Sequence, residues 1–193
     1  MRPVAVFLSL LVAASPLHAA SVTVELRDSR EAAVDGAVVY AVPAAAAPAP
    51  PPGVAVMDQR NRVFVPRILP IQVGTRVRFP NSDNVLHQVY SFSKAKRFQL
   101  PLYQGTPAVP VLFDKPGVVA LGCNIHDRMS AFIVVVDTPY FALTERGRAE
   151  LLELPAGRYT VRVWHEGMKD EPKPEPVVLG ADDKRELTLR IAR

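Results

Sequence analysis

The sequence predicts an all-β protein, and three observations support this. Valine and threonine recur in short runs, and both residue types are enriched in strands. Few stretches carry apolar residues at helical spacing. The 19 prolines and 10 glycines divide the chain of 193 residues into short segments with turn signals between them. Many short strands of this kind are typical of a β-sandwich or barrel.

Composition excludes several classes of protein. Hydrophobic residues make up 49% and charged residues 22%, so the chain is not a highly charged disordered one. Its length suggests one or two domains. The net charge of +4 is scattered, with no basic stripe interleaved with aromatic residues, so we expect no nucleic acid partner. The single cysteine excludes a disulfide framework, a cysteine-rich zinc site and an iron–sulfur cluster.

Residues 1–20 have the pattern of a secretory signal peptide. A short positive start, Met1-Arg2, precedes the apolar run Val4–Ala14, and a breaker at Pro16 is followed by small residues. The alternative is a buried N-terminal helix. We expect cleavage between Ala19 and Val22 and export, most simply to the periplasm. No later segment is long enough to span a membrane, so the mature chain should contain no membrane span.

The N-terminal part of the mature chain predicts two strands and a linker. Ser21–Arg27 alternates apolar and polar residues as a half-buried strand does, and Ala37–Val42 follows a turn region. Residues 43–53, PAAAAPAPPPG, are incompatible with a strand interior and predict a semi-rigid extended linker.

The rest of the chain predicts strands throughout. From residue 54 to 137 we expect strands at Ile68–Val73, Thr75–Phe79, Val85–Phe92, Arg97–Leu100, Val109–Phe113, Val118–Cys123 and Ala131–Asp137. From residue 138 to 193 we expect them at Tyr140–Thr144, Arg148–Leu154, Arg158–His165, Pro176–Leu179 and Lys184–Ile191.

One group of residues has the chemistry of a metal site. Cys123, His126 and Met129 form C-x2-H-x2-M where a predicted strand ends, and His87 lies far upstream. Thiolate, two imidazoles and a weak thioether suit both copper(I), which is soft, and copper(II), which is borderline. A short loop leaving a strand can turn three of these side chains towards one point. The fourth ligand must then come from a neighbouring strand.

Other interpretations of these residues are compatible with the sequence. Cys123 could be a buried inert thiol and Met129 part of the core. Zinc is the rival metal, although a thioether contributes little to a zinc site. Nothing in the local sequence places His87 in the site. A second site using His165 has little support because one imidazole seldom suffices. We see no Ser/His/Asp or paired-carboxylate constellation, so we do not expect an enzyme.

Residues 63–137 resemble the cupredoxins, small blue-copper Greek-key sandwiches. The similarity rests on Phe64-Val65-Pro66, Val73–Asp83, His87, Phe113–Gly117 and Cys123–Met129. It implies one copper ion per chain, cycling between Cu(I) and Cu(II), with His87, Cys123 and His126 as strong ligands and Met129 as axial ligand. It also implies single-electron transport between redox proteins. The short loop is similar to that of amicyanin, and the whole chain resembles exported proteins labelled methylamine utilization proteins.

The sequence departs from the cupredoxin pattern at several positions. Gln88 stands where many members have asparagine, and Asn124 stands where threonine or serine is frequent. Asp127 and Arg128 replace the apolar residues that follow the loop histidine in amicyanin. Alternative functions are copper delivery to an oxidase or dehydrogenase, or a metal-free structural β module.

The flanking segments resemble two halves of a transthyretin-like, carboxypeptidase-regulatory-like sandwich. The similarity rests on Val34–Tyr40, Thr144–Gly147 and Leu154–Val161. Neither residues 21–42 nor 138–193 can bury a two-sheet core alone, so we expect the cupredoxin domain, 54–137, to be inserted into this host. The alternative is one larger sandwich. Trp164 falls on the polar face of its strand, where it could cover the junction.

Overall fold

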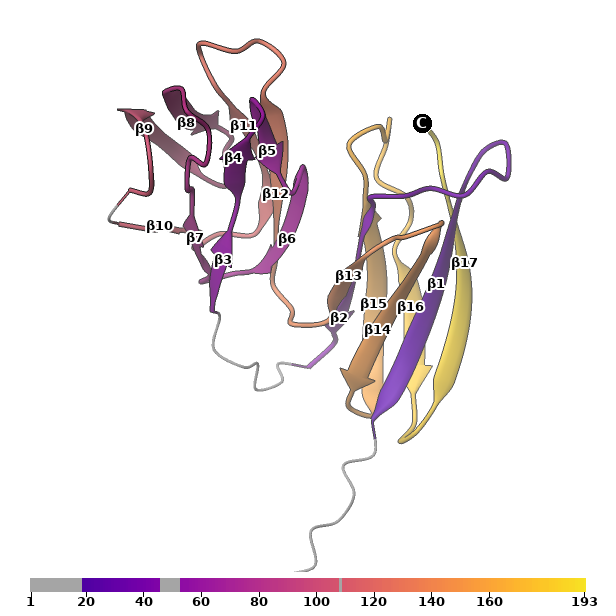
Figure 1. The fold of residues 1–193 in the computed structure, drawn as a ribbon. Coiled ribbons are helices and arrows are strands. Elements are labelled where there is room, and N and C mark those ends of the chain that lie inside the picture. The colour runs from indigo at the N-terminus through magenta and orange to yellow at the C-terminus, as the bar shows by residue number, and fades with distance from the viewer. Residues whose placement is uncertain (1–18, 46–52, 108) are drawn as a thin grey trace, which may run out of the picture.

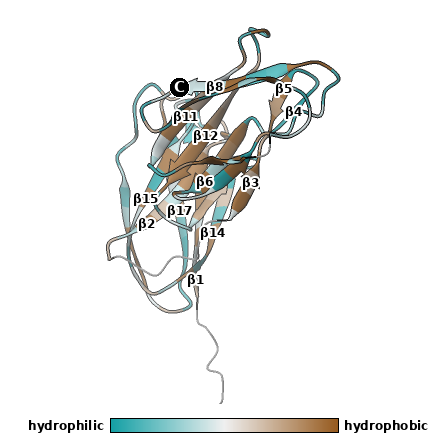
Figure 2. Cartoon of the chain, turned by 90° about the vertical axis from the view of Figure 1, so that its left-hand side faces the viewer, coloured by the Kyte–Doolittle hydropathy of each residue, from teal (hydrophilic) through white to brown (hydrophobic). Residues whose placement is uncertain are grey.

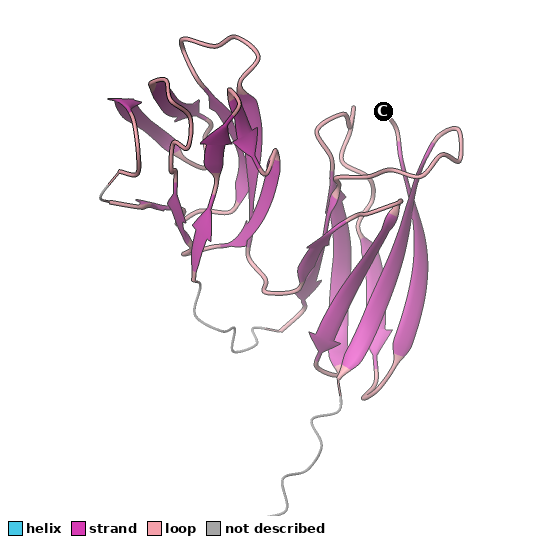
Figure 3. Cartoon of the chain, viewed as in Figure 1, coloured by secondary structure: helices cyan, strands magenta, loops and turns pink. Residues whose placement is uncertain are grey.

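The computed structural model describes residues 19–45, 53–107 and 109–193. Within these ranges the chain forms seventeen strands and no helix, which confirms the all-β prediction (Figure 3). It follows that this part of the chain holds no helix able to cross a membrane. Most of the predicted signal peptide and the greater part of the predicted linker lie outside the described residues.

The two ends of the chain together build one pair of sheets, on the right in Figure 1. The three-stranded sheet has the order β14-β1-β17, with β14 at Arg148–Leu154, β1 at Ala20–Asp28 and β17 at Lys184–Ile191. The four-stranded sheet has the order β13-β2-β15-β16, with β13 at Phe141–Leu143, β2 at Val38–Pro43, β15 at Gly157–Trp164 and β16 at Glu175–Leu179.

The core of this pair of sheets draws on both ends of the sequence. Strand β1 is buried at every second position, as alternation predicts, and it pairs in parallel with β17 from Ser21 to Asp28. Its inward side chains pack with those of β14, β15 and β16, including Leu151, Val161 and Leu179. Residues 20–28 therefore depend on strands more than a hundred positions away for burial.

The middle of the chain forms the second group of sheets, on the left in Figure 1. The five-stranded sheet has the order β6-β12-β11-β8-β9, with β6 at Ile68–Gln72, β12 at Ser130–Val136, β11 at Gly117–Gly122, β8 at His87–Phe92 and β9 at Arg97–Tyr103. The three-stranded sheet has the order β10-β7-β3, with β10 at Val111–Leu112, β7 at Arg76–Arg78 and β3 at Val54–Val56. A hairpin joins β4, Asp58–Arg60, to β5, Val63–Val65.

These sheets enclose a second core, which contains Phe79 and Phe113 as its largest buried side chains. The rings of both contact that of Phe98: the Phe79 ring is tilted against it at a centroid distance of 5.6 Å, and the Phe113 ring meets it edge to face at 6.0 Å. Cys123 and Met129 belong to this same cluster. The predicted metal loop is therefore anchored in the apolar interior at its two ends, Cys123 and Met129, while the residues between them are exposed or half-buried.

The structure matches every strand predicted from the sequence to within a few residues and adds three. Strands β3, β4 and β5 were not predicted. Each has only three residues, which is too short for alternation to be detected, and each owes its pairing to a distant or hairpin partner. The predicted strand at 97–100 extends to Tyr103 because it pairs with β8 as far as His87.

The two groups of sheets meet along a small apolar junction. Val134 and Val136 of β12 and Ile68 of β6 pack against Val38, with Trp164 and Tyr40 at the edge. The Trp164 ring lies 5.3 Å from that of Phe132, which confirms its predicted place at the junction. Figure 2, in which apolar residues are brown, shows β6 and β12 largely in brown. The junction therefore covers the outer face of β12, leaving the metal loop clear of it.

Candidate metal centre

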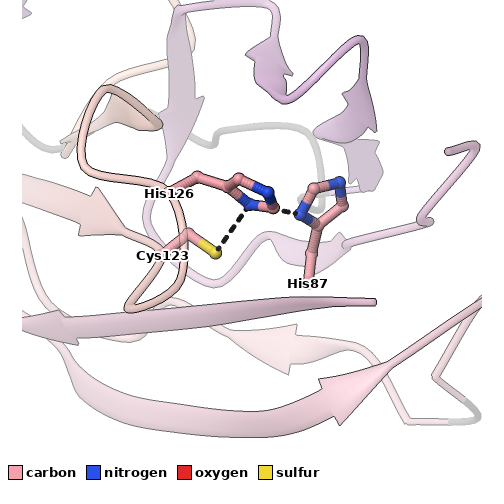
Figure 4. A group of neighbouring side chains, drawn as sticks. All are labelled: His87, Cys123 and His126. Carbon is pink, nitrogen blue, oxygen red and sulfur yellow. Dashed lines mark hydrogen bonds between the residues drawn. The ribbon is translucent and has the colours of Figure 1, made fainter. Parts of the chain in front are cut away.

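The structure brings His87, Cys123 and His126 together (Figure 4). One donor atom from each lies within 4.8 Å of the others. The Nδ1 atoms of the two histidines are 3.2 Å apart, and Cys123 Sγ is 3.8 Å from His126 Nδ1. Within the described residues, no other set of three or more His, Cys, Asp and Glu side chains lies close enough to share a metal ion.

Strand pairing explains why residues so far apart in sequence meet. Strand β8 begins at His87, and β11 ends at Gly122, directly before Cys123. The two strands are antiparallel with Gly122 opposite Tyr90, so the end of β11 lies beside the start of β8. Strand β12 then returns along β11. The loop 123–129 therefore leaves and re-enters the sheet next to His87.

The three residues differ in burial. His87 is fully buried and Cys123 is 5% exposed, whereas His126 is only half-buried at the surface end of the loop. A thiol and an imidazole shielded from water thus face an imidazole that solvent or a partner can reach.

Met129 is the last residue of the loop, and its side chain lies in the core. Its side chain is 2% exposed and packs in the same core cluster as Cys123. Its backbone N–H donates to the carbonyl of His126 at 3.0 Å, which fixes the turn between these two residues. The fourth predicted ligand thus lies in the core on the buried side of the loop.

Asp83 holds the His87 ring. Its Oδ2 atom lies 2.7 Å from His87 Nε2 and accepts a hydrogen bond from that nitrogen. The Nδ1 lone pair of His87 is consequently free to face His126 and Cys123. A carboxylate bound to the outer nitrogen of a histidine fixes its tautomer and raises its basicity as a ligand.

The same carboxylate anchors a hairpin turn. It accepts the backbone amides of Asn61 at 2.6 Å and Arg62 at 2.9 Å. Both residues have positive φ, as the tight β4–β5 turn requires. Burial acts to raise the pKa of Asp83, but the hydrogen bonds from Arg62, His87 and Asn61 outweigh it and hold the pKa below its ordinary value.

A second hydrogen bond ties the two ligand-bearing segments together. Asn124 Nδ2 donates to Gln88 Oε1 at 2.5 Å. Both are positions at which the sequence departs from the cupredoxin pattern, and these two departures meet as a complementary pair. Sequence analysis singled out neither this bond nor the role of Asp83. The spacing of four residues between Asp83 and His87 was the available signal.

The donor set and its geometry fit a small tetrahedral or trigonal metal ion. Metal–nitrogen bonds of about 2.0 Å and metal–sulfur bonds of about 2.3 Å place ligand atoms roughly 3.3–3.8 Å apart. The separations of 3.2 and 3.8 Å lie close to this range, and all three donor atoms lie within 4.8 Å of one another. A thiolate with two imidazoles and a nearby thioether is the donor combination that suits copper in both oxidation states.

His165 lies apart from this group. Its Nδ1 accepts the backbone N–H of Gly167 at 3.0 Å. Burial, reinforced by Arg193, lowers the pKa of His165. The described residues place no set of metal donors around it, consistent with the weak sequence support for a second site.

Comparison with solved structures finds similar chains among copper proteins. The copper-containing nitrite reductase of Thermus scotoductus SA-01 is 27% identical with a TM-score of 0.41, over 49% of this chain and 25% of that one. A purple cupredoxin from Nitrosopumilus maritimus is 23% identical with a TM-score of 0.38, over 42% and 99%. A reduced amicyanin mutant is 20% identical with a TM-score of 0.39, over 50% and 99%. No protein-family model matches the sequence, and a search of curated proteins finds no match.

Proposed function

We propose that this protein is a type 1 copper protein that carries single electrons between redox partners. The observation that carries the proposal is the convergence of His87, Cys123 and His126 donor atoms within 4.8 Å at the end of a buried β-sheet. Met129 would complete the set as the weak axial ligand. Bound copper would supply a one-electron redox centre, and the protein would be a carrier rather than an enzyme.

The residues around the site suit this role because they restrict rearrangement. Asp83 fixes His87 on strand β8, and the Gln88–Asn124 bond fixes the Cys123 segment against it. The apolar core below Cys123 and Met129 excludes water from the thiolate. A centre whose ligands are already in place needs little movement when its charge changes. The half-buried His126 leaves an edge of the site within reach of a partner.

An optical spectrum of the copper-loaded mature protein, with its metal stoichiometry, tests the proposal. We expect one copper per chain and an intense blue colour in the oxidised state from Cys123 thiolate donation. Cys123→Ser should abolish the colour, while Ser130→Ala, an exposed neighbour of the loop, should keep it. A protein that takes up zinc in preference to copper, or one that binds neither, would overturn the proposal.

We also propose a cellular setting and a domain arrangement. The signal-peptide pattern of residues 1–20 supports export to the periplasm, where redox proteins would be donor and acceptor. The separate cores formed by residues 54–136 and by the two chain ends support a cupredoxin domain inserted into a transthyretin-like host. The resemblance to methylamine utilization proteins supports this setting.

A further inference from the structure

A cavity of about 630 Å³ lies at the junction of the two groups of sheets. One wall comes from the end of β12 and the start of β11, and the other from β2, β15 and residues 165–171. Strand β11 runs from Gly117, at the cavity, to Gly122, beside Cys123. The cavity therefore lies at the opposite end of β11 from the candidate metal centre and shares no residue with it.

The cavity has an aromatic and apolar side. Tyr40 and Trp164, both half-buried, line it together with Val134 and Val136. These side chains also belong to the junction cluster, and the Trp164 ring is held against Phe132. The rings are thus immobilised at the cavity wall, which lowers the entropic cost of packing a ligand against them.

The polar side of the cavity carries both donors and acceptors. Arg162 lies opposite Tyr40 in the β15–β2 pairing, and its Nη1 donates to Glu171 Oε1 at 2.9 Å. Burial raises the pKa of Tyr40, and the negative charges of Glu171 and Asp137 raise it further. The Tyr40 hydroxyl, the guanidinium of Arg162 and these two carboxylates therefore lie near one another around a shared space.

The charges of the lining are mixed. Arg162 and Lys169 are cationic, while Asp137, Asp170 and Glu171 are anionic. Glu166, a further lining residue, is already paired with Arg67 through contacts of 3.0 and 2.5 Å. The carboxylates would repel a strongly anionic ligand, and Arg162 and Lys169 would repel a cationic one. The lining therefore favours a neutral ligand.

We propose that this cavity binds a neutral saccharide. A sugar hydroxyl both donates and accepts hydrogen bonds, so it uses a guanidinium and a carboxylate side by side. A sugar ring also presents an apolar C–H face, which suits Tyr40 and Trp164. The volume lies within the range in which proteins enclose small molecules.

Tryptophan fluorescence provides the test, because Trp164 is the single tryptophan of the chain. The mature protein would be titrated with cellobiose, maltose and N-acetylglucosamine, and with citrate and choline as charged probes. We expect a saturable change with at least one sugar and at least tenfold weaker responses to both charged probes. A charged probe that binds more tightly than every sugar, or no saturable response to any of the three sugars, would overturn the proposal.

Two variants locate the binding. Arg162→Gln and Glu171→Gln should each weaken sugar binding about tenfold or more, because each removes a charged hydrogen-bonding partner. Arg158→Gln, an exposed residue of β15 outside the cavity lining, is the matched control and should bind as wild type. Equal affinity in all three variants would place the sugar elsewhere and reject the assignment.

The sugar titration and the copper spectrum test the two proposals independently, so either proposal can be rejected without the other. The cavity contains none of His87, Cys123, His126 or Met129. Sugar affinity should therefore be the same, within twofold, in copper-free and copper-loaded protein. Arg162→Gln should leave the copper spectrum unchanged.

Discussion

The Nε2 atom of His87 lies 2.7 Å from Asp83 Oδ2, and the same carboxylate accepts the amides of Asn61 and Arg62. One side chain therefore orients a buried histidine and fixes the turn of the β4–β5 hairpin above it. This arrangement links the candidate metal centre to a part of the fold that contributes no candidate ligand.

Asp83→Asn should weaken copper(II) binding about 10–100-fold, because a carboxylate behind a ligating histidine supports both its orientation and its basicity. Asp127→Asn, at an exposed position beside His126, is the matched control and should have a much smaller effect. Competition titration with a copper chelator measures both. Equal affinity of the Asp83 and Asp127 variants would show that the Asp83 contact does not support metal binding.

The sequence was sufficient to predict the candidate metal loop but not its surroundings. Cys123, His126 and Met129 lie within seven residues, so their chemistry is visible as a local pattern. His87 joins them only through the pairing of β8 with β11, which no local pattern encodes. Its assignment in the sequence rested on the cupredoxin resemblance.

The interactions that fix the site depend on register and were not predicted. Gln88 and Asn124 appeared in sequence only as departures from a familiar pattern, and their mutual hydrogen bond requires the observed strand alignment. The hairpin held by Asp83 is formed by strands of three residues each, too short to show periodicity. Longer strands such as β1 were predicted well because alternation extends over their whole length.

Gly147→Ala should destabilise the protein more than Gly105→Ala. Both glycines have positive φ, 74° and 76°, so either alanine costs about 1–2 kcal/mol of backbone strain. A Cβ at residue 147 would also lie 2.7 Å from the Cβ of Ala33 and 3.1 Å from the Leu26 carbonyl oxygen, whereas a Cβ at residue 105 would meet nothing within 4 Å beyond its chain neighbours. The crowding should add about 1–3 kcal/mol.

Urea denaturation of the two glycine variants measures the difference directly. A smaller loss of unfolding free energy in Gly147→Ala than in Gly105→Ala would contradict the close packing of residues 145–148 against β1.

Asp28→Asn should reduce stability at neutral pH but have less effect in acid. The buried carboxylate accepts the amides of Arg30 at 2.9 Å and Ala32 at 3.0 Å, and Arg193 lies 3.2 Å away. The Arg30 amide contributes most to lowering its pKa, and the contacts together outweigh the opposing effect of burial. A carboxyl group whose pKa is lower in the folded than in the unfolded state stabilises the fold above its unfolded pKa. This contribution is lost as the pH falls through the folded pKa.

Urea midpoints of wild type and Asp28→Asn, compared at pH 7 and near pH 3, test this sign. The difference in urea midpoint between wild type and Asp28→Asn should be smaller near pH 3 than at pH 7. The control Glu186→Gln, at an exposed position, should have nearly the wild-type midpoint at both pH values. A midpoint difference that grows as the pH falls would mean that burial, rather than the amide contacts, determines the direction of the Asp28 pKa shift.

Residues 53–138, expressed alone, should fold and bind copper. Their core cluster draws only on residues from 55 to 135, and it contains Cys123 and Met129. What the excised piece loses is the junction, in which Ile68, Val134 and Val136 pack against Val38. Exposing these side chains should lower stability and solubility while leaving the metal loop intact, because the loop lies at the other end of β11.

Optical spectra and NMR dispersion of the excised piece measure ligand geometry and folding separately. The copper spectrum should match that of the full chain, and the excised Cys123→Ser variant should fold without colour. A piece that shows no dispersed resonances with or without copper would contradict the insertion model, because it would mean that the middle of the chain needs the terminal strands to fold. The molecule would then be one continuous sandwich, with the junction of Val38, Ile68 and Val134 as part of a single core.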